Sequence, residues 1–364
     1  MERISTHQFI KLAAALVLGQ SFLSAGSLST MIAGRDGWIA TFLGFLAGIP
    51  FILLALSISF RYPGKNFLQI TEQVLGKWLG KIIGVIYILL TIRFGTLIVS
   101  QGVDMYTRTV LPIMSHYVIV LGILLIIIYL FYSGIEVLGR FSEVIYPIIF
   151  LSLIFIAIFI FPHFEHGELF PILADGLVPI IKVSVQVLTW PLGYILFLAG
   201  LLPFIPREKK EQKKMYKGVI RAVIIVSILS TLLVVVQIST FGPFEAARLT
   251  YGLLVLSNMV EVLNAISGVE VIFTLIWMGS IVLKSTALIF AGYWGIQTIF
   301  GIKGKIASIF LCLLYILIPI WLFRGSALVV SIWEMNQFII TPFVIVWLLI
   351  LWGGDKWKRR KKAA

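Results

Sequence analysis

The chain is built from long apolar runs separated by short polar or charged segments. Stretches such as 12–34 and 38–60 hold no charged residue over a length that crosses a hydrocarbon layer, which takes about 20 helical residues. The runs are continuous and do not alternate with a period of two, so they predict spanning helices and not the strands of a membrane barrel. We expect ten such helices, near residues 8–33, 38–60, 82–106, 114–132, 141–161, 178–204, 215–240, 269–299, 306–323 and 336–352.

The cationic residues are distributed unevenly between the two alternating sets of loops. Of 29 Lys and Arg, 22 lie in the even-numbered loops and the terminal segments, four in the other loops, and three inside predicted spans. The positive-inside rule places the first set in the cytoplasm, with both termini and the basic tail 353–364. Because this asymmetry explains most of the net charge of +13, we expect no nucleic-acid partner.

Composition excludes a water-soluble enzyme. The chain is 60% hydrophobic and 12% charged, with a mean hydropathy of +1.06, which is far too apolar for a soluble domain. The single cysteine, Cys312, excludes a disulfide framework, and no phosphate-binding loop, nucleophile elbow or zinc motif is found. We therefore expect residues 1–364 to form one transmembrane domain without catalytic residues, metal or cofactor.

Two of the predicted spans contain helix-weakening residues at corresponding places in the two five-helix halves. Proline removes a backbone donor, and glycine lowers helix propensity. Matched interruptions favour a substrate site where the halves meet, and packing kinks are the alternative explanation. The candidate ligand-binding residues are Ser24, Ala25, Gly26 and Ser27 of the first span, Thr189, Trp190, Pro191, Gly193 and Tyr194 of the sixth, and the facing Gln101 and Trp277.

Four ionisable residues, Arg93, Asp104, Glu270 and Lys284, lie within spans and are candidates for coupling. Charge inside a bilayer is costly, so such residues are functional suspects. The alternative role of Arg93 is to pair with a buried acidic residue and so fix the packing of the helices. The alternative role of Glu270 is to cap the start of the eighth predicted helix. Ser285 and Thr286 follow Lys284 and resemble a sodium site, although a neighbouring lysine repels sodium.

Several short motifs, in this order and spacing, resemble those of one known family. The matching residues are Ala25-Gly26, Asp36-Gly37-Trp38-Ile39, Gly76-Lys77-Trp78-Leu79-Gly80, Gly134 with Arg140, Phe170-Pro171 with Gly176, the basic loop from Pro203 to Lys214, and Glu270 with Trp277. On these residues the chain resembles the B subunit of bacterial spore germinant receptors, the endospore germination permeases of the amino acid–polyamine–organocation superfamily. It departs from the family pattern at Gly268, where an arginine is common, and at Ser29-Thr30-Met31, where Leu-Pro is common.

The resemblance implies an all-α membrane protein with a LeuT-like 5+5 inverted repeat and broken helices 1 and 6. It also implies a germinant-sensing subunit of the spore inner membrane, associated with a large A subunit and a lipoprotein C subunit. Such a subunit binds a small germinant, usually an amino acid, and helps to start germination. Secondary active amino acid transport, coupled to protons or sodium, is the alternative function, because both use the same fold.

Overall fold

A computed structural model describes residues 4–110, 113–206, 208–260, 269–302, 304–322, 334 and 336–363, and these are almost entirely helical. Some side chains within helices, including those of Ser24, Tyr194 and Glu270, lie outside this description. The longer helices are α1 (Thr6–Ala33), α2 (Gly37–Arg61), α4 (Lys77–Met105), α5 (His116–Tyr132), α6 (Ile135–Ile160), α9 (Lys209–Arg248), α11 (Val269–Phe300), α12 (Lys305–Leu322) and α14 (Thr341–Ala363). The shorter ones are α3 (Phe67–Leu75), α7 (Leu177–Val187), α8 (Thr189–Leu201) and α10 (Gly252–Asn258), with turns η1 (Gly34–Asp36), η2 (Tyr106–Val110), η3 (Phe161–His163), η4 (His166–Leu169), η5 (Leu202–Phe204) and η6 (Asn336–Ile340).

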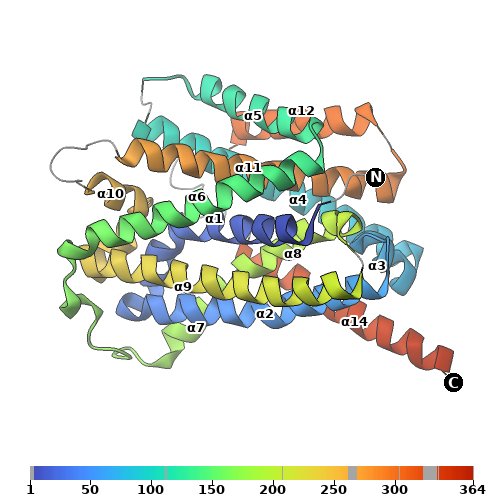
Figure 1. Cartoon of the computed structure of the whole chain (residues 1–364), viewed down its shortest axis with the longest axis horizontal. Helices are drawn as coiled ribbons and strands as arrows, with labels where there is room; N and C mark the ends of the chain where they lie inside the picture. The colour runs from blue at the N-terminus through green and yellow to red at the C-terminus, as the bar shows by residue number, and fades with distance from the viewer. Residues whose placement is uncertain are drawn as a thin grey trace.

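The long helices lie side by side along one axis of the molecule (Figure 1). Both chain ends and α3 lie at one end of the bundle, and α10 lies at the opposite end. Within the described residues, six segments are long and apolar enough to cross a membrane, and two shorter apolar helices accompany them. The protein is therefore a multi-pass membrane protein. For convenience, the end that carries the chain termini is called the inner end and the other the outer end.

The helices differ in how much of their surface the protein itself covers. In α11, 78% of the most apolar stretch is buried within the protein, and in α4 the share is 67%. The corresponding share in the stretch Ile135–His163 is only 28%, which leaves most of α6 to face lipid. The protein therefore covers most of α4 and α11, and residues 12–18 of α1, which packs beside α9, are also buried.

Local sequence explains where the inner-end helices begin. The side chain of Ser5 accepts a hydrogen bond from the backbone N–H of Gln8, and the side-chain oxygen of Gln8 accepts one from the backbone N–H of Ser5, which makes a capping box for α1. Asn66 and Gln69 do the same for α3. Gly76 separates α3 from α4 with a φ of 91°, a conformation that favours glycine.

The structure differs from the sequence prediction in the first span. α1 is one helix from Thr6 to Ala33 and has no interruption at residues 24–27. Glycine weakens a helix by about 1 kcal/mol, whereas an unsatisfied backbone group in lipid costs several. The small residues therefore leave the helix intact. Their role is to let neighbouring helices approach, as described below for Gly19 and Gly26.

The predicted interruption of the sixth span is confirmed, slightly earlier in the chain than expected. α7 ends at Val187 and α8 begins at Thr189, with Leu188 between them. Pro191 then falls in the first turn of α8, where a missing amide hydrogen costs no intrahelical bond. The seventh span contains a further bend, because α9 kinks at Gly242, whose φ is 71°.

Candidate ligand-binding site

Close contacts at Gly19 fix how α1 and α11 face each other. A β-carbon at Gly19 would overlap the hydroxyl of Ser280 and would lie 2.9 Å from Cε and 3.0 Å from Nζ of Lys284. Only glycine leaves room for the buried lysine side chain, which is 2% exposed. Gly19 lies in the middle of α1, so Lys284 lies at about half the depth of the bundle.

Gly26 lies seven residues further along α1, about 10 Å nearer the outer end at 1.5 Å per residue. There a β-carbon would overlap Oε1 of Gln237 on α9 and would lie 2.8 Å from its Nε2. The neighbouring Ala25 and Ser27 are buried. Trp277 precedes Lys284 by seven residues, and α1 and α11 are oppositely directed spans, so its buried side chain lies near the depth of Gly26.

The start of α8 reaches the same depth through its contacts with α2. The hydroxyl groups of Ser29 and Thr41 are 2.8 Å apart, which pairs α1 with α2. Gly48 follows Thr41 by seven residues, and a β-carbon there would lie 2.5 Å from Cγ of Pro191. Pro191 therefore lies between the depths of Gly19 and Gly26.

The side chains around Pro191 pack in several directions. Trp190 lies against Phe45 of α2, with ring centroids 5.7 Å apart, and Thr189 is buried beside it. Gly193 points toward α4, where Phe94 is 3.9 Å from the position of a β-carbon.

Gln101 joins this central region from α4. The next residue, Gly102, would place a β-carbon 2.6 Å from Cδ1 of Ile281, so buried Gln101 lies at about the depth of Gly19 and Lys284. The described parts of the four candidate segments thus meet in one layer about 10 Å deep. We call this the central layer.

Of the other candidate coupling residues, Arg93 lies outside the central layer and Asp104 lies within its depth. Arg93 is eight residues inward of Gln101 on α4, about 12 Å away along the axis. Asp104 is three residues outward of Gln101, about 4.5 Å along the axis, and its carboxylate accepts a hydrogen bond of 3.0 Å from Tyr251, just before α10. Glu270 belongs to the first turn of α11, and its side chain is outside the described set.

The central layer contains several of the buried polar atoms that lack a hydrogen-bond partner among the described residues, and others lie elsewhere in the bundle. Those in the central layer are the indole nitrogen of Trp277, the hydroxyl groups of Thr189, Ser280 and Ser285, and both amide atoms of Gln237. More than nine in ten buried polar groups in proteins are bonded, so several orphans in one layer mark a place where a ligand or water supplies the bonds.

Gln237 is the residue of this layer that the sequence analysis missed. Its side chain is fully buried in α9 and touches both Gly26 of α1 and Gly252 of α10. The available signal was an amide within an otherwise apolar span, which is costly in lipid unless it has a partner.

Two observations bear on metal or sodium binding by the described residues. They contain no group of three His, Cys, Asp or Glu side chains able to hold a metal ion. The hydroxyl of Thr286, one of the two residues that resemble a sodium site, donates to the carbonyl of Val282 in its own helix.

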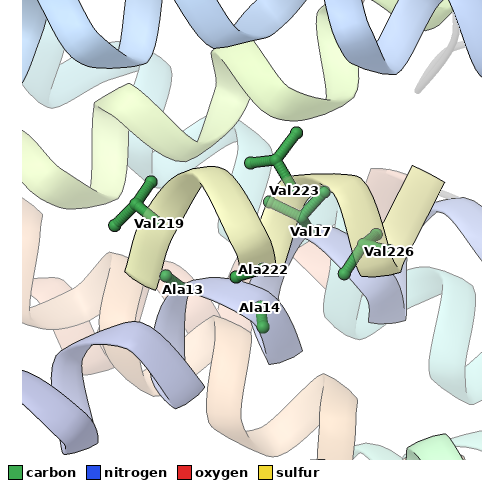
Figure 2. Close-up of a pocket in the computed structure, with 7 residues that line it drawn as sticks. All are labelled: Ala13, Ala14, Val17, Val219, Ala222, Val223 and Val226. Carbon is green, nitrogen blue, oxygen red and sulfur yellow. The ribbon is translucent and has the colours of Figure 1, made fainter. Parts of the chain in front are cut away.

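The pocket drawn in Figure 2 is lined only by alanine and valine. Its α1 residues precede Gly19 in the chain, so it lies inward of the central layer. The lining residues are Ala13, Ala14 and Val17 of α1 and Val219, Ala222, Val223 and Val226 of α9. This pocket reflects small side chains between two parallel helices and offers no polar group to a nutrient.

Comparison with known proteins extends over most of the chain. Residues 3–328 match the family model described as spore germination protein. The chain is 26% identical to spore germination protein KB of Bacillus subtilis (strain 168), covering 99% of this chain and 96% of that protein. It is 22% identical to spore germination protein GerQB of Bacillus cereus, covering 96% and 95%. Spore germination protein YndE of Bacillus subtilis (strain 168) is 27% identical over 187 residues, so that match spans half of each protein.

Solved structures of transporters share the fold at low sequence identity. MhsT in complex with L-phenylalanine superposes with a TM-score of 0.73, at 14% identity, over 96% of this chain and 89% of that one. Mhp1, a nucleobase-cation-symport-1 family transporter with bromovinylhydantoin bound, gives 0.70 at 12% identity over 95% and 78%. A Na⁺-coupled sialic acid symporter gives 0.69 at 15% identity over 94% and 78%. These are transporters of the LeuT fold, and the family and fold are those of permeases and receptors. By its sequence the chain belongs to the spore germination protein family, and its fold is the LeuT-type fold.

Proposed function

We propose that this chain is the nutrient-sensing transmembrane subunit of a spore receptor, and that it binds an amino acid in the central layer. It resides in the spore inner membrane with both termini in the cytoplasm, and it signals to a receptor A subunit and a lipoprotein C subunit. The observation that carries the proposal is the set of unpartnered polar atoms at half depth, contributed by α8, α9 and α11 around α1. Family membership supports the role in germination.

The chemistry of the layer suits a zwitterion. A carboxylate binds at the start of α8, where the amides of a first helical turn lack intrahelical acceptors. The α-amino group binds carbonyl oxygens at the end of α7, and the amino acid side chain lies against Trp190 and Trp277. Ala25 to Ser27 form the wall contributed by α1, and Gln101 forms the wall contributed by α4.

Binding produces a signal only if the nutrient favours one conformation over another. An empty closed layer keeps several polar groups without bonds, and each such group costs about 1–3 kcal/mol. A nutrient that satisfies them stabilises the closed arrangement of α1 and α8 relative to an open one. The A subunit responds to that shift.

Secondary amino acid transport is the second candidate, and Lys284 is the observation that favours it. Its side chain is buried at half depth and adjoins α1 at Gly19, where loss and gain of a proton would alter the contact between the two helices. A sensing subunit uses the same group as a fixed charge that sets how α1 and α11 pack.

Germination of a strain lacking only this subunit tests the proposal. We expect such spores to lose their response to one amino acid and to keep responses to nutrients sensed by other receptors. An unchanged response to all amino acids would refute the proposed function. Uptake of the radiolabelled amino acid into vesicles containing the intact receptor then separates the two candidates, because only a transporter accumulates it.

A further inference from the structure

We propose that Gln237 is a specificity-determining residue, which hydrogen-bonds a neutral polar side chain of the bound amino acid. The inference rests on the proposed function and adds the class of nutrient. Gln237 would favour amino acids with an amide or hydroxyl side chain over apolar amino acids of the same size.

The first argument is the unusual position of this carboxamide. The Gln237 side chain has no exposed surface, and neither Oε1 nor Nε2 has a partner among the described residues. An apolar residue would avoid the cost of burying both groups, about 1–3 kcal/mol for each unsatisfied atom. A carboxamide that is buried without a bond to any described residue is one that a ligand from outside the protein would satisfy.

The second argument is the set of glycines around the amide. Gly26 of α1 contacts it on one side, and on another side a β-carbon at Gly252 of α10 would lie 2.6 Å from Oε1. Neither Gly26 nor Gly252 has a side chain that could cover the amide. The amide of Gln237 is therefore a polar group available to a ligand where α1, α9 and α10 meet. The junction borders the proposed nutrient site, since Gly26 belongs to both.

The third argument concerns charge. Gly26 and Gly252, the two glycines that contact the amide, bring no charge to it. A charged ligand group here would lose its hydration without gaining a counter-charge, which is expensive. A neutral group that both donates and accepts, such as a second carboxamide, satisfies Oε1 and Nε2 together.

Access to the amide is from the outer end. α10 covers it there, and the adjacent Tyr251 is held to Asp104 of α4 by the 3.0 Å hydrogen bond. Displacement of this short helix uncovers Gln237 without breaking any spanning helix. A nutrient that enters from the outer end therefore meets this amide early.

The test compares L-asparagine with L-leucine, which are nearly equal in size and differ in hydrogen bonding. Dose–response curves for germination are measured on spores carrying the intact receptor, either with the natural chain or with Gln237→Leu. We expect Gln237→Leu to raise the half-maximal concentration of L-asparagine, L-glutamine or L-serine about tenfold or more, with no comparable loss for L-leucine. Gln297→Leu, the same exchange on α11 at the inner end, serves as the matched control and should leave the curves unchanged.

Protein levels in spore membranes are checked by immunoblot, and Gln237→Met is used if Gln237→Leu does not accumulate. Equal curves for natural and Gln237 variant spores would overturn the inference, and so would a natural receptor that answers only to apolar amino acids. If the strain lacking the whole subunit still responds normally to every probe, the proposed function fails. If that strain loses a response that Gln237→Leu retains in full, only this inference fails.

Discussion

The contact between Gly26 and Gln237 allows a stringent test by a double substitution. Gly26→Ala adds a β-carbon that overlaps Oε1 of Gln237 and comes within 2.8 Å of Nε2. A flexible side chain usually moves away, but this one is fully buried and is confined on another side by Gly252. Overpacking of this kind costs about 1–3 kcal/mol. The higher helix propensity of alanine returns at most about 1 kcal/mol, so Gly26→Ala should be destabilising overall.

Gln237→Ala removes the obstructing amide, so the penalty of Gly26→Ala should largely disappear in the double variant. We expect a coupling free energy of about 1–3 kcal/mol, read from unfolding of the full-length chain in lipid nanodiscs. Germination should follow the same order, with Gly26→Ala impaired before any nutrient is varied. Gly122→Ala is the matched control, because a β-carbon at that position on α5 has open space around it.

Additive effects of the two substitutions would refute this reasoning. They would mean that Gly26 is required for a feature of its own backbone, such as an interruption of α1, and not for the approach of Gln237. A destabilising Gly122→Ala would also count against it, since alanine should then be unfavourable in these helices in general.

Three further predictions follow from the described contacts. Lys284→Met should raise the half-maximal nutrient concentration at least tenfold while the protein remains in the membrane; an unchanged dose–response curve would contradict this. Trp277→Phe removes an indole nitrogen that has no hydrogen-bond partner among the described residues, and should change nutrient response more than stability; a large loss of stability with a normal response would show a packing role instead. Asp355→Asn should lower the free energy of unfolding by about 1–3 kcal/mol, because Asp355 accepts bonds of 2.7 Å from Arg61 and Tyr62. Burial acts to raise the pKa of Asp355, but these bonds outweigh it and hold the pKa below its ordinary value, so its stabilisation is present at neutral pH and is lost as the pH falls through that lowered pKa. Unfolding measured across pH 7 to 3 should therefore show the gap between natural and Asp355→Asn protein closing, and a constant gap would exclude this electrostatic origin.

Apolar runs were sufficient to predict the spanning helices. The run 114–132, for instance, corresponds closely to α5 at His116–Tyr132, because a helix in lipid satisfies its own backbone and its ends follow the ends of the apolar run. The sixth span was also predicted to be interrupted. Its break was expected around Pro191 and occurs at Leu188, since proline is compatible with the first turn of the following helix.

The continuity of α1 was not predictable from its glycines and serines alone. Gly26 is equally consistent with a broken helix and with a close contact, and only the position of α9 decides between them. Gln237 was missed for the same reason, because an isolated amide in an apolar run does not reveal which helices surround it. The depth shared by Gly19 and Lys284 likewise depends on how two helices pack that are distant in sequence.

Equilibrium binding tests the central claim most directly. The radiolabelled amino acid that triggers germination in natural spores but not in the deletion strain is titrated against membrane vesicles containing the intact receptor. We predict saturable binding that Gly26→Trp abolishes, because a large side chain would fill the junction of α1 with α9, and that Gly122→Trp on α5 retains. Equal binding by the Gly26→Trp and Gly122→Trp receptors would contradict a nutrient site in the central layer.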